Sequence, residues 1–134
     1  MKQEDKDLLL RDLCGRLPYG VKISKVIDNF ISEPHQIRSI NLNNIIIEDG
    51  EFEDGTPDID VWDIENIKPY LFPLSSMTEE QEEELIKLIN TGQNDNNEFM
   101  RSLCRIEFYH KYHFDYRELI PKGLALDATN LNIY

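Results

Sequence analysis

Glu107, His110 and His113 have the residue types and the spacing of a metal site. Residues three apart on a helix project to one side, and a carboxylate with two imidazoles is a ligand set that zinc or iron accepts. The same positions also continue an apolar stripe that starts at Phe99, and the helix dipole stabilises a histidine near a helix C-terminus. We therefore favour core histidines. The alternative is a small metal-dependent enzyme whose metal activates water as a Lewis acid.

A second group of possible ligands lies in the acidic middle of the chain, where carboxylates could gather around a hard cation such as Ca²⁺ or Mg²⁺. These carboxylates belong to Glu53, Asp54, Asp58, Asp60 and Asp63. The EF-hand pattern fails, because Gly50 and Phe52 occupy positions that should carry Asp or Asn. A solvated acidic loop is the favoured interpretation.

Other catalytic signatures are absent from the sequence. There is no G-x-S-x-G nucleophile motif and no glycine-rich phosphate loop, so we expect no nucleotide cofactor. Cys14 and Cys104 lie in helical apolar patterns rather than in a C-x-x-C pair, which predicts buried thiols in a reducing compartment. We expect no cofactor and a cytoplasmic protein.

The composition of the chain limits the classes of partner that the protein could bind. The chain has 134 residues, with Lys+Arg 14 against Asp+Glu 26, a formal charge of −12, and 40% hydrophobic residues. That length and apolar content predict one domain, residues 1–134. The acidic balance disfavours direct binding to nucleic acid, and no apolar run is long enough to span a membrane. The charge alone leaves open an acidic DNA mimic that blocks a basic nuclease or repressor.

Hydrophobic periodicity and turn residues predict the elements that position these groups. In the first half of the chain we expect a helix over about 4–15 ended by Gly15, strands over 21–31, 36–42, 45–47 and 59–64, and an exposed loop over 51–57. The prolines at 69 and 73 predict that residues 67–74 are extended over the core without forming a central strand.

The second half of the chain is predicted to be mainly helical. Thr78 and Gln81 form a capping-box pattern, and the helix that follows is predicted to end at Thr91-Gly92. A long helix is expected over about 97–113, and the apolar tail beyond it is predicted to dock on the protein.

Together these elements predict an α+β fold. We expect an N-terminal helix, a small antiparallel sheet of three to five strands over about 20–64, and a C-terminal helical pair packed on one face of the sheet. The candidate interaction surface comprises Phe52, Glu53, Asp54, Asp58, Asp60 and Trp62. For Trp62 the core is the favoured location.

Three stretches frame the chain: Lys6 to Val21, Ile64 to Thr78, and His113 to Ala128. They resemble a family of short proteins of unknown function that recur in gut Bacteroidales genomes, often in phage-like or mobile segments. The resemblance implies a scaffold made by the framing stretches and a middle, Ile23 to Val61, in which members differ. It brings no activity, cofactor or catalytic residue with it.

The function we expect is a non-enzymatic protein-interaction module of a mobile element or phage. Its acidic middle loop and an exposed sheet edge would meet an unidentified protein partner encoded by the host or by the element. The absence of catalytic motifs supports this expectation.

Overall fold

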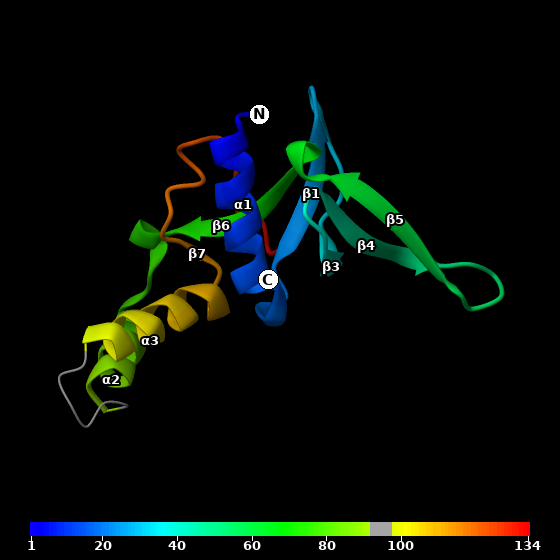
Figure 1. Ribbon diagram of the computed structural model, residues 1–134. Coiled ribbons are helices and arrows are strands. Elements are labelled where there is room, and N and C mark those ends of the chain that lie inside the picture. Colours follow the sequence, from blue (N-terminus) through cyan, green and yellow to red (C-terminus); the bar gives the residue numbers. More distant parts are fainter. Residues whose placement is uncertain (92–97) are drawn as a thin grey trace.

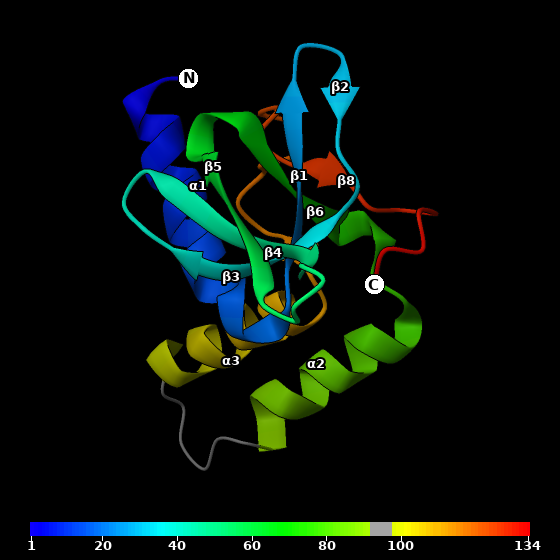
Figure 2. The same cartoon turned by 90° about the vertical axis from the view of Figure 1, so that its right-hand side faces the viewer.

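The computed structural model describes residues 1–91 and 98–134. Its helices are α1 (Gln3–Arg16), α2 (Glu79–Thr91) and α3 (Glu98–Lys111). Its strands are β1 (Lys22–Ile27), β2 (Phe30–Ile31), β3 (His35–Ile40), β4 (Asn44–Glu51), β5 (Pro57–Asp63), β6 (Ile67–Pro73), β7 (Phe114–Asp115) and β8 (Leu126–Asp127). Figure 1 shows the arrangement of most of these elements, and Figure 2 also labels β2 and β8.

The sheet is larger than expected and mixed. The described residues form eight strands in the order β5-β4-β3-β1-β6-β7, with β2 paired to β1 and β8 paired to β6. Strands β1 to β6 pair antiparallel, whereas β7 and β8 run parallel to β6. Parallel neighbours need a long crossover, which α2 and α3 supply between β6 and β7. The protein is thus α+β, but the expectation of a small antiparallel sheet is wrong.

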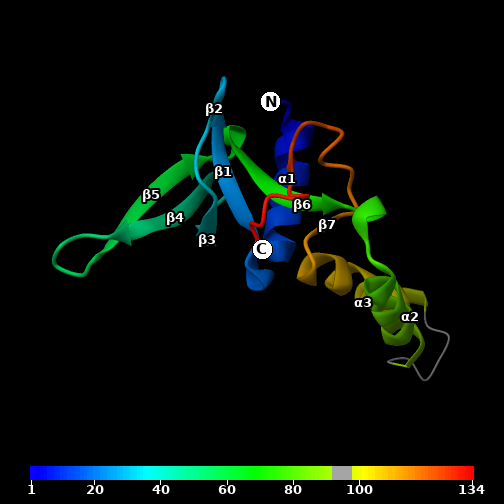
Figure 3. The ribbon, with the colours of Figure 1, turned by 180° about the vertical axis from the view of Figure 1, so that it is seen from behind.

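The N-terminal helix, rather than the C-terminal pair, packs on the sheet. Leu9 and Leu13 of α1 are fully buried in the core with Ile23, Ile45 and Ile47 of the strands. The α2–α3 pair stands beyond the β6–β7 end of the sheet, so the expectation that it covers a sheet face is wrong (Figures 1 and 3). The expectation of two buried cysteines is wrong, because Cys14 is exposed and Cys104 is half-buried.

The segment after α1 differs in two places from the expected pattern. Gly15 does not end the helix, which runs to Arg16 and a 3-10 turn before the left-handed Gly20 (φ 72°). Residues 21–31 form a hairpin of β1 and β2 rather than one strand, with Ile27 opposite Phe30. Asp28 takes a left-handed conformation in the two-residue turn (φ 52°), which aspartate tolerates.

β6 is an interior strand despite its prolines, so the expectation for residues 67–74 is wrong. Pro69 lies opposite Ile23 of β1. Backbone groups alternate between the two edges of a strand, and the Tyr70 carbonyl faces the β1 side, where it accepts from the Tyr134 hydroxyl. The nitrogen of Pro69 therefore points to the other edge, where pairing with β8 begins only at Tyr70. The missing N–H costs no ladder hydrogen bond.

The capping box of α2 is confirmed. The Thr78 amide donates to Gln81 Oε1 at 2.9 Å, and the Gln81 amide donates to Thr78 Oγ1 at 3.2 Å. α2 is described as far as Thr91, the first residue of the predicted end at Thr91-Gly92. Gly92 and the predicted start of the next helix at Asn97 lie outside the described residues. α3 ends at Lys111, two residues before the predicted end.

The chain beyond α3 docks on the protein as expected, since Leu124, Ala125 and Ala128 are buried. Within residues 1–91 and 98–134, no helix is both long enough and apolar enough to cross a membrane.

Candidate functional site

The β4–β5 hairpin projects from the body of the protein (Figures 1 and 3). Its tip is held by two backbone hydrogen bonds, from Phe52 N–H to the Thr56 carbonyl at 2.8 Å and from Gly55 N–H to the Phe52 carbonyl at 2.9 Å. Gly55 has φ 85°, a conformation that residues with a Cβ rarely adopt. The side chain of Phe52 is 56% exposed at this tip.

The tip carries fixed negative charge. Asp54 Oδ1 accepts hydrogen bonds from Thr56 Oγ1 at 2.6 Å and from Thr56 N–H at 3.0 Å. These bonds lower the pKa of Asp54 below its usual value, so the carboxylate remains ionised. Glu53 beside it is exposed. The predicted exposure of residues 51–57 is confirmed, although Glu51 and Pro57 belong to the strands rather than to the loop.

The side chains of β5 alternate between two sides, as the sequence pattern predicts, and only Trp62 among them is buried. Trp62 is 4% exposed and pairs with the buried Ile45 of β4. On the opposite side Ile59 is 47% exposed and Val61 is 54% exposed. Two large apolar side chains thus face solvent next to the acidic tip.

Asp60 and Trp62 have structural roles within the hairpin. Asp60 Oδ2 accepts from the indole Nε1–H of Trp62 at 2.9 Å, and Oδ1 accepts from the Val61 amide at 2.9 Å. The Trp62 ring meets the His35 ring edge-on at 5.1 Å, and Lys25 Nζ lies 5.9 Å from its centroid. Trp62 therefore belongs to the core and not to the candidate surface. Asp58 is half-buried on the same side of β5.

The candidate metal ligands do not converge. His113 follows the end of α3 with φ 61°, and its ring stacks on Tyr134 at 3.6 Å. His110 Nε2 lies 2.7 Å from the Tyr116 hydroxyl, at hydrogen-bond distance. Glu107 is exposed beside a shallow hollow that it shares with Lys111. Within the described residues, neither these three nor the acidic residues of the middle segment form a group that could hold a metal ion.

Burial explains the chemistry of both histidines. Desolvation, with the Arg16 charge as the next cause, lowers the pKa of His110 and of His113 to about 4. Both rings are therefore neutral at pH 7. The geometry agrees with core histidines.

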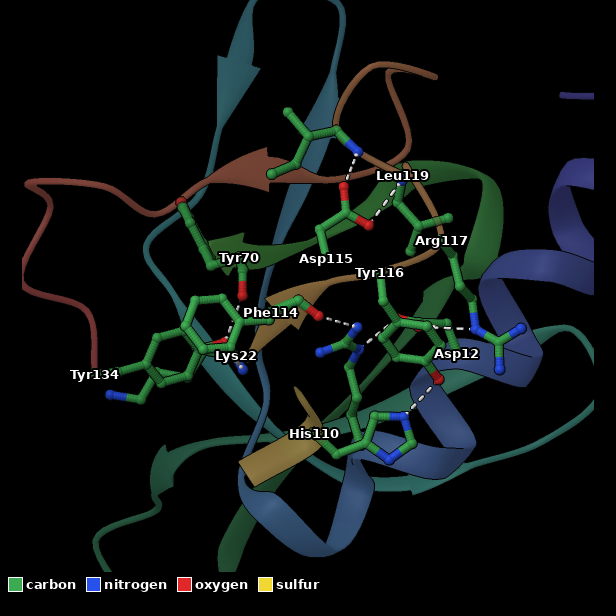
Figure 4. A network of polar contacts seen from close by, with 12 residues as sticks. Asp12, Lys22, Tyr70, His110, Phe114, Asp115, Tyr116, Arg117, Leu119 and Tyr134 are labelled. Atoms are coloured by element: carbon green, nitrogen blue, oxygen red, sulfur yellow. Dashed lines mark hydrogen bonds and ion pairs between the residues drawn. The ribbon is translucent and has the colours of Figure 1, made fainter. Parts of the chain in front are cut away.

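A buried ionic network joins α1 to the chain beyond α3, and the sequence interpretation missed it (Figure 4). Arg16 Nε donates to Asp12 Oδ2 at 2.7 Å, and another guanidinium nitrogen donates to the Phe114 carbonyl at 2.6 Å. Arg117 Nε lies 3.2 Å from Asp12 Oδ1. Asp12 and Arg16 are fully buried. The sequence signal that could have predicted this ion pair is the spacing of Asp12 and Arg16, four residues apart in α1.

Comparison of the chain with protein-family models, with curated proteins and with solved structures gave no match. The resemblance to short Bacteroidales proteins therefore remains a prediction.

Proposed function

We propose that this protein is a non-enzymatic interaction module that binds a positively charged protein through its β4–β5 hairpin. One observation carries the proposal: the exposed side chains of Ile59 and Val61 form an apolar strip on a projecting, acidic hairpin. Exposed apolar side chains that lie side by side, rimmed by polar residues, are typical of protein-binding surfaces. We name Ile59 and Val61 the hairpin strip; Phe52 is exposed at the tip beyond it.

The charge distribution supports a basic partner. The net charge of −12 attracts a positively charged protein from a distance and raises the rate of encounter, while apolar contact with the hairpin strip would slow dissociation. The ionised Asp54 places charge next to Phe52. Binding should therefore weaken with salt but not vanish, because the apolar part of the contact is insensitive to screening.

The predicted resemblance suggests where the partner comes from. All of the hairpin except its last two residues, Trp62 and Asp63, lies within residues 23–61, the segment in which members of the resembled family are expected to differ. A partner encoded by the host or by a mobile element fits a surface that changes between members while the framing stretches form the scaffold. The proposed contact uses no cofactor.

The test compares two variants in a pull-down of tagged protein from a gut Bacteroidales lysate at low and high salt. The double variant Ile59→Thr/Val61→Thr keeps the β-branched side chains that strands prefer but removes apolar surface. Ile31→Thr makes the same change at a residue of β2 that is 53% exposed and serves as the matched control. Circular dichroism establishes that both variants fold.

We expect a stoichiometric basic protein to be retained by the wild type and by Ile31→Thr and lost from the double variant. Equal retention by both variants would refute the proposal. Binding that is unaffected by the double variant but is competed by duplex DNA would instead support an acidic DNA mimic.

A further inference from the structure

We propose that the partner presents a basic amphipathic α-helix, which lies across the open face of β4 and β5 instead of adding a strand to the edge of β5. This inference rests on the proposed function and specifies the chemistry of the partner segment. Three features of the hairpin carry it: the occupied edge of β5, the shape of its open face, and the charges at the ends of that face.

The first feature is the edge of β5, which is poorly suited to accept another strand. Ile64 N–H donates to the Asn43 carbonyl at 3.0 Å, so the even-numbered residues of β5 direct their backbone groups toward β4. The odd-numbered residues direct theirs to the free edge. Strand addition would use those outward N–H groups as donors.

Two of the outward positions cannot donate to an added strand. Pro57 has no N–H, and the Val61 N–H is already bonded to Asp60 Oδ1 at 2.9 Å. The Asp60 carboxylate also holds the Trp62 indole, so it is anchored from two sides. Proteins commonly protect edge strands by proline and by charged side chains. An incoming strand would have to displace this carboxylate.

The second feature is the open face itself. Val61 lies opposite the half-buried Ile46 of β4, and Ile59 lies opposite Glu48. Their side chains point away from the face that carries Trp62 and packs toward α1. The seven residues of β5 span roughly 23 Å. A helix of about 15 residues has the same length and can present an apolar stripe to the hairpin strip and to Ile46 beside it.

The third feature is the placement of charge. Asp63 lies at one end of β5, and Glu53 with the ionised Asp54 lies at the hairpin tip. Glu48, on the side of the strip, is paired with Arg38 at 3.0 Å. Acidic groups thus mark both ends of an apolar strip. A helix with an apolar stripe and Lys or Arg at its two ends complements this arrangement, whereas a second copy of this acidic chain would place like charges together.

Three synthetic peptides of about 15 residues test this inference by titration into labelled protein, monitored by methyl chemical shifts. The first is an amphipathic helix with leucines in one stripe and lysines elsewhere. The second replaces every lysine by glutamate. The third has the composition of the first, with leucine and lysine alternating so that it favours a strand.

We expect only the basic helical peptide to bind, with the largest methyl shifts at Ile46, Ile59 and Val61. Val61→Thr should weaken its binding by about tenfold, whereas Ile31→Thr should leave it unchanged. Asp63→Asn should weaken binding more than Glu83→Gln, which removes an exposed charge from α2. The Asp63→Asn side chain retains an oxygen that can accept the Glu65 amide, as the Asp63 carboxylate does at 3.0 Å, so local structure is kept.

The inference is overturned if the alternating peptide binds as tightly as the helical one, or if Val61→Thr and Ile31→Thr behave alike. The pull-down separates this failure from failure of the proposed function. A lysate protein retained by Ile31→Thr and lost from the double variant, without peptide binding, would leave the interaction module standing and would reject the helix. Equal retention by both variants would reject both.

Discussion

Gly15 of α1 lies directly against the imidazole of His110 in α3. A Cβ placed on Gly15 would come within 2.7 Å of His110 Cε1 and 3.3 Å of Nε2. The imidazole has little freedom to move, because Nε2 is at hydrogen-bond distance from the Tyr116 hydroxyl. The glycine therefore permits close contact of two helices, which explains a glycine inside a helix where alanine would be the better helix former.

Gly15→Ala should lower the free energy of unfolding by about 1–3 kcal/mol, despite the higher helix propensity of alanine. Urea denaturation measures the change. The double variant Gly15→Ala/His110→Ala supplies the control, since removing the ring removes the clash. Its destabilisation should be clearly smaller than the sum of the two single effects. Simple additivity would show that the contact is not a steric constraint.

Arg16→Met should destabilise the protein by about 3–5 kcal/mol, because it breaks a buried ion pair and leaves the Phe114 carbonyl without this donor. Arg38→Met is the matched control. Arg38 pairs with Glu48 at the surface, where an ion pair contributes about 0–1 kcal/mol. Chemical denaturation of both variants measures the difference. Similar losses of stability in the two variants would show that the buried contacts of Arg16 contribute no more than a surface ion pair.

Stability should fall as the pH decreases from 7 to 5. Burial lowers the pKa of His110 and His113 to about 4 in the folded state, whereas an unfolded histidine titrates near 6.5. Between these values the unfolded chain binds more protons, so acid favours unfolding. The expected loss is about 2 kcal/mol per histidine at pH 5, measured as the free energy of unfolding at both pH values.

His113→Phe tests this assignment, because phenylalanine keeps the stack on Tyr134 but does not titrate. The variant should show about half of the wild-type loss between pH 7 and 5. An unchanged loss would assign the pH dependence to other groups.

Tyr134→Phe should loosen the junction between β1 and β6. The Tyr134 hydroxyl accepts from Lys22 N–H at 2.9 Å and donates to the Tyr70 carbonyl at 2.7 Å, one position beyond the last β1–β6 pair. Burial raises the pKa of Tyr134, so the phenol keeps its proton. Loss of the hydroxyl should cost about 1–2 kcal/mol and speed hydrogen exchange of the Lys22 amide.

Tyr19→Phe is the control for that prediction, because Tyr19 is a partly exposed tyrosine outside this junction. It should leave exchange at Lys22 unchanged. Equal exchange rates in both variants would show that the hydroxyl does not join the two strands.

Asp60→Ala should expose the edge of β5. The change frees the Val61 amide and removes the acceptor of the Trp62 indole. An unprotected edge strand pairs with other strands, so we expect concentration-dependent self-association in analytical ultracentrifugation. Asp58→Ala also removes one negative charge but leaves the Val61 amide bonded to Asp60, so this variant should show the same association state as the wild type. Association of both variants to the same extent would show that charge, rather than the occupied amide, protects the edge.

The candidate surface was predictable in part, because each correct feature depended on local pattern. Alternation in residues 59–64 placed Trp62 and Val61 on opposite sides, and glycine and acidic residues marked the exposed tip at 52–56. The capping box located the start of α2 for the same reason. The local pattern did not show that the Asp60 carboxylate accepts a hydrogen bond from the Val61 amide, because this contact depends on the conformation of the folded strand.

By itself, the sequence determined the helix over α1, the start of α2, the β4–β5 hairpin with its acidic tip, and the excess of negative charge, because these depend on neighbours within a few residues. Only the tertiary structure decided the rest. Pro69 can lie in an interior strand because its nitrogen faces the β8 edge of β6, where pairing begins only at Tyr70. Asp12 and Arg16 form a buried ionic network because the Phe114 carbonyl and Arg117, about 100 residues away in the sequence, pack against α1. Such partners are set by long-range packing, which no local spacing encodes.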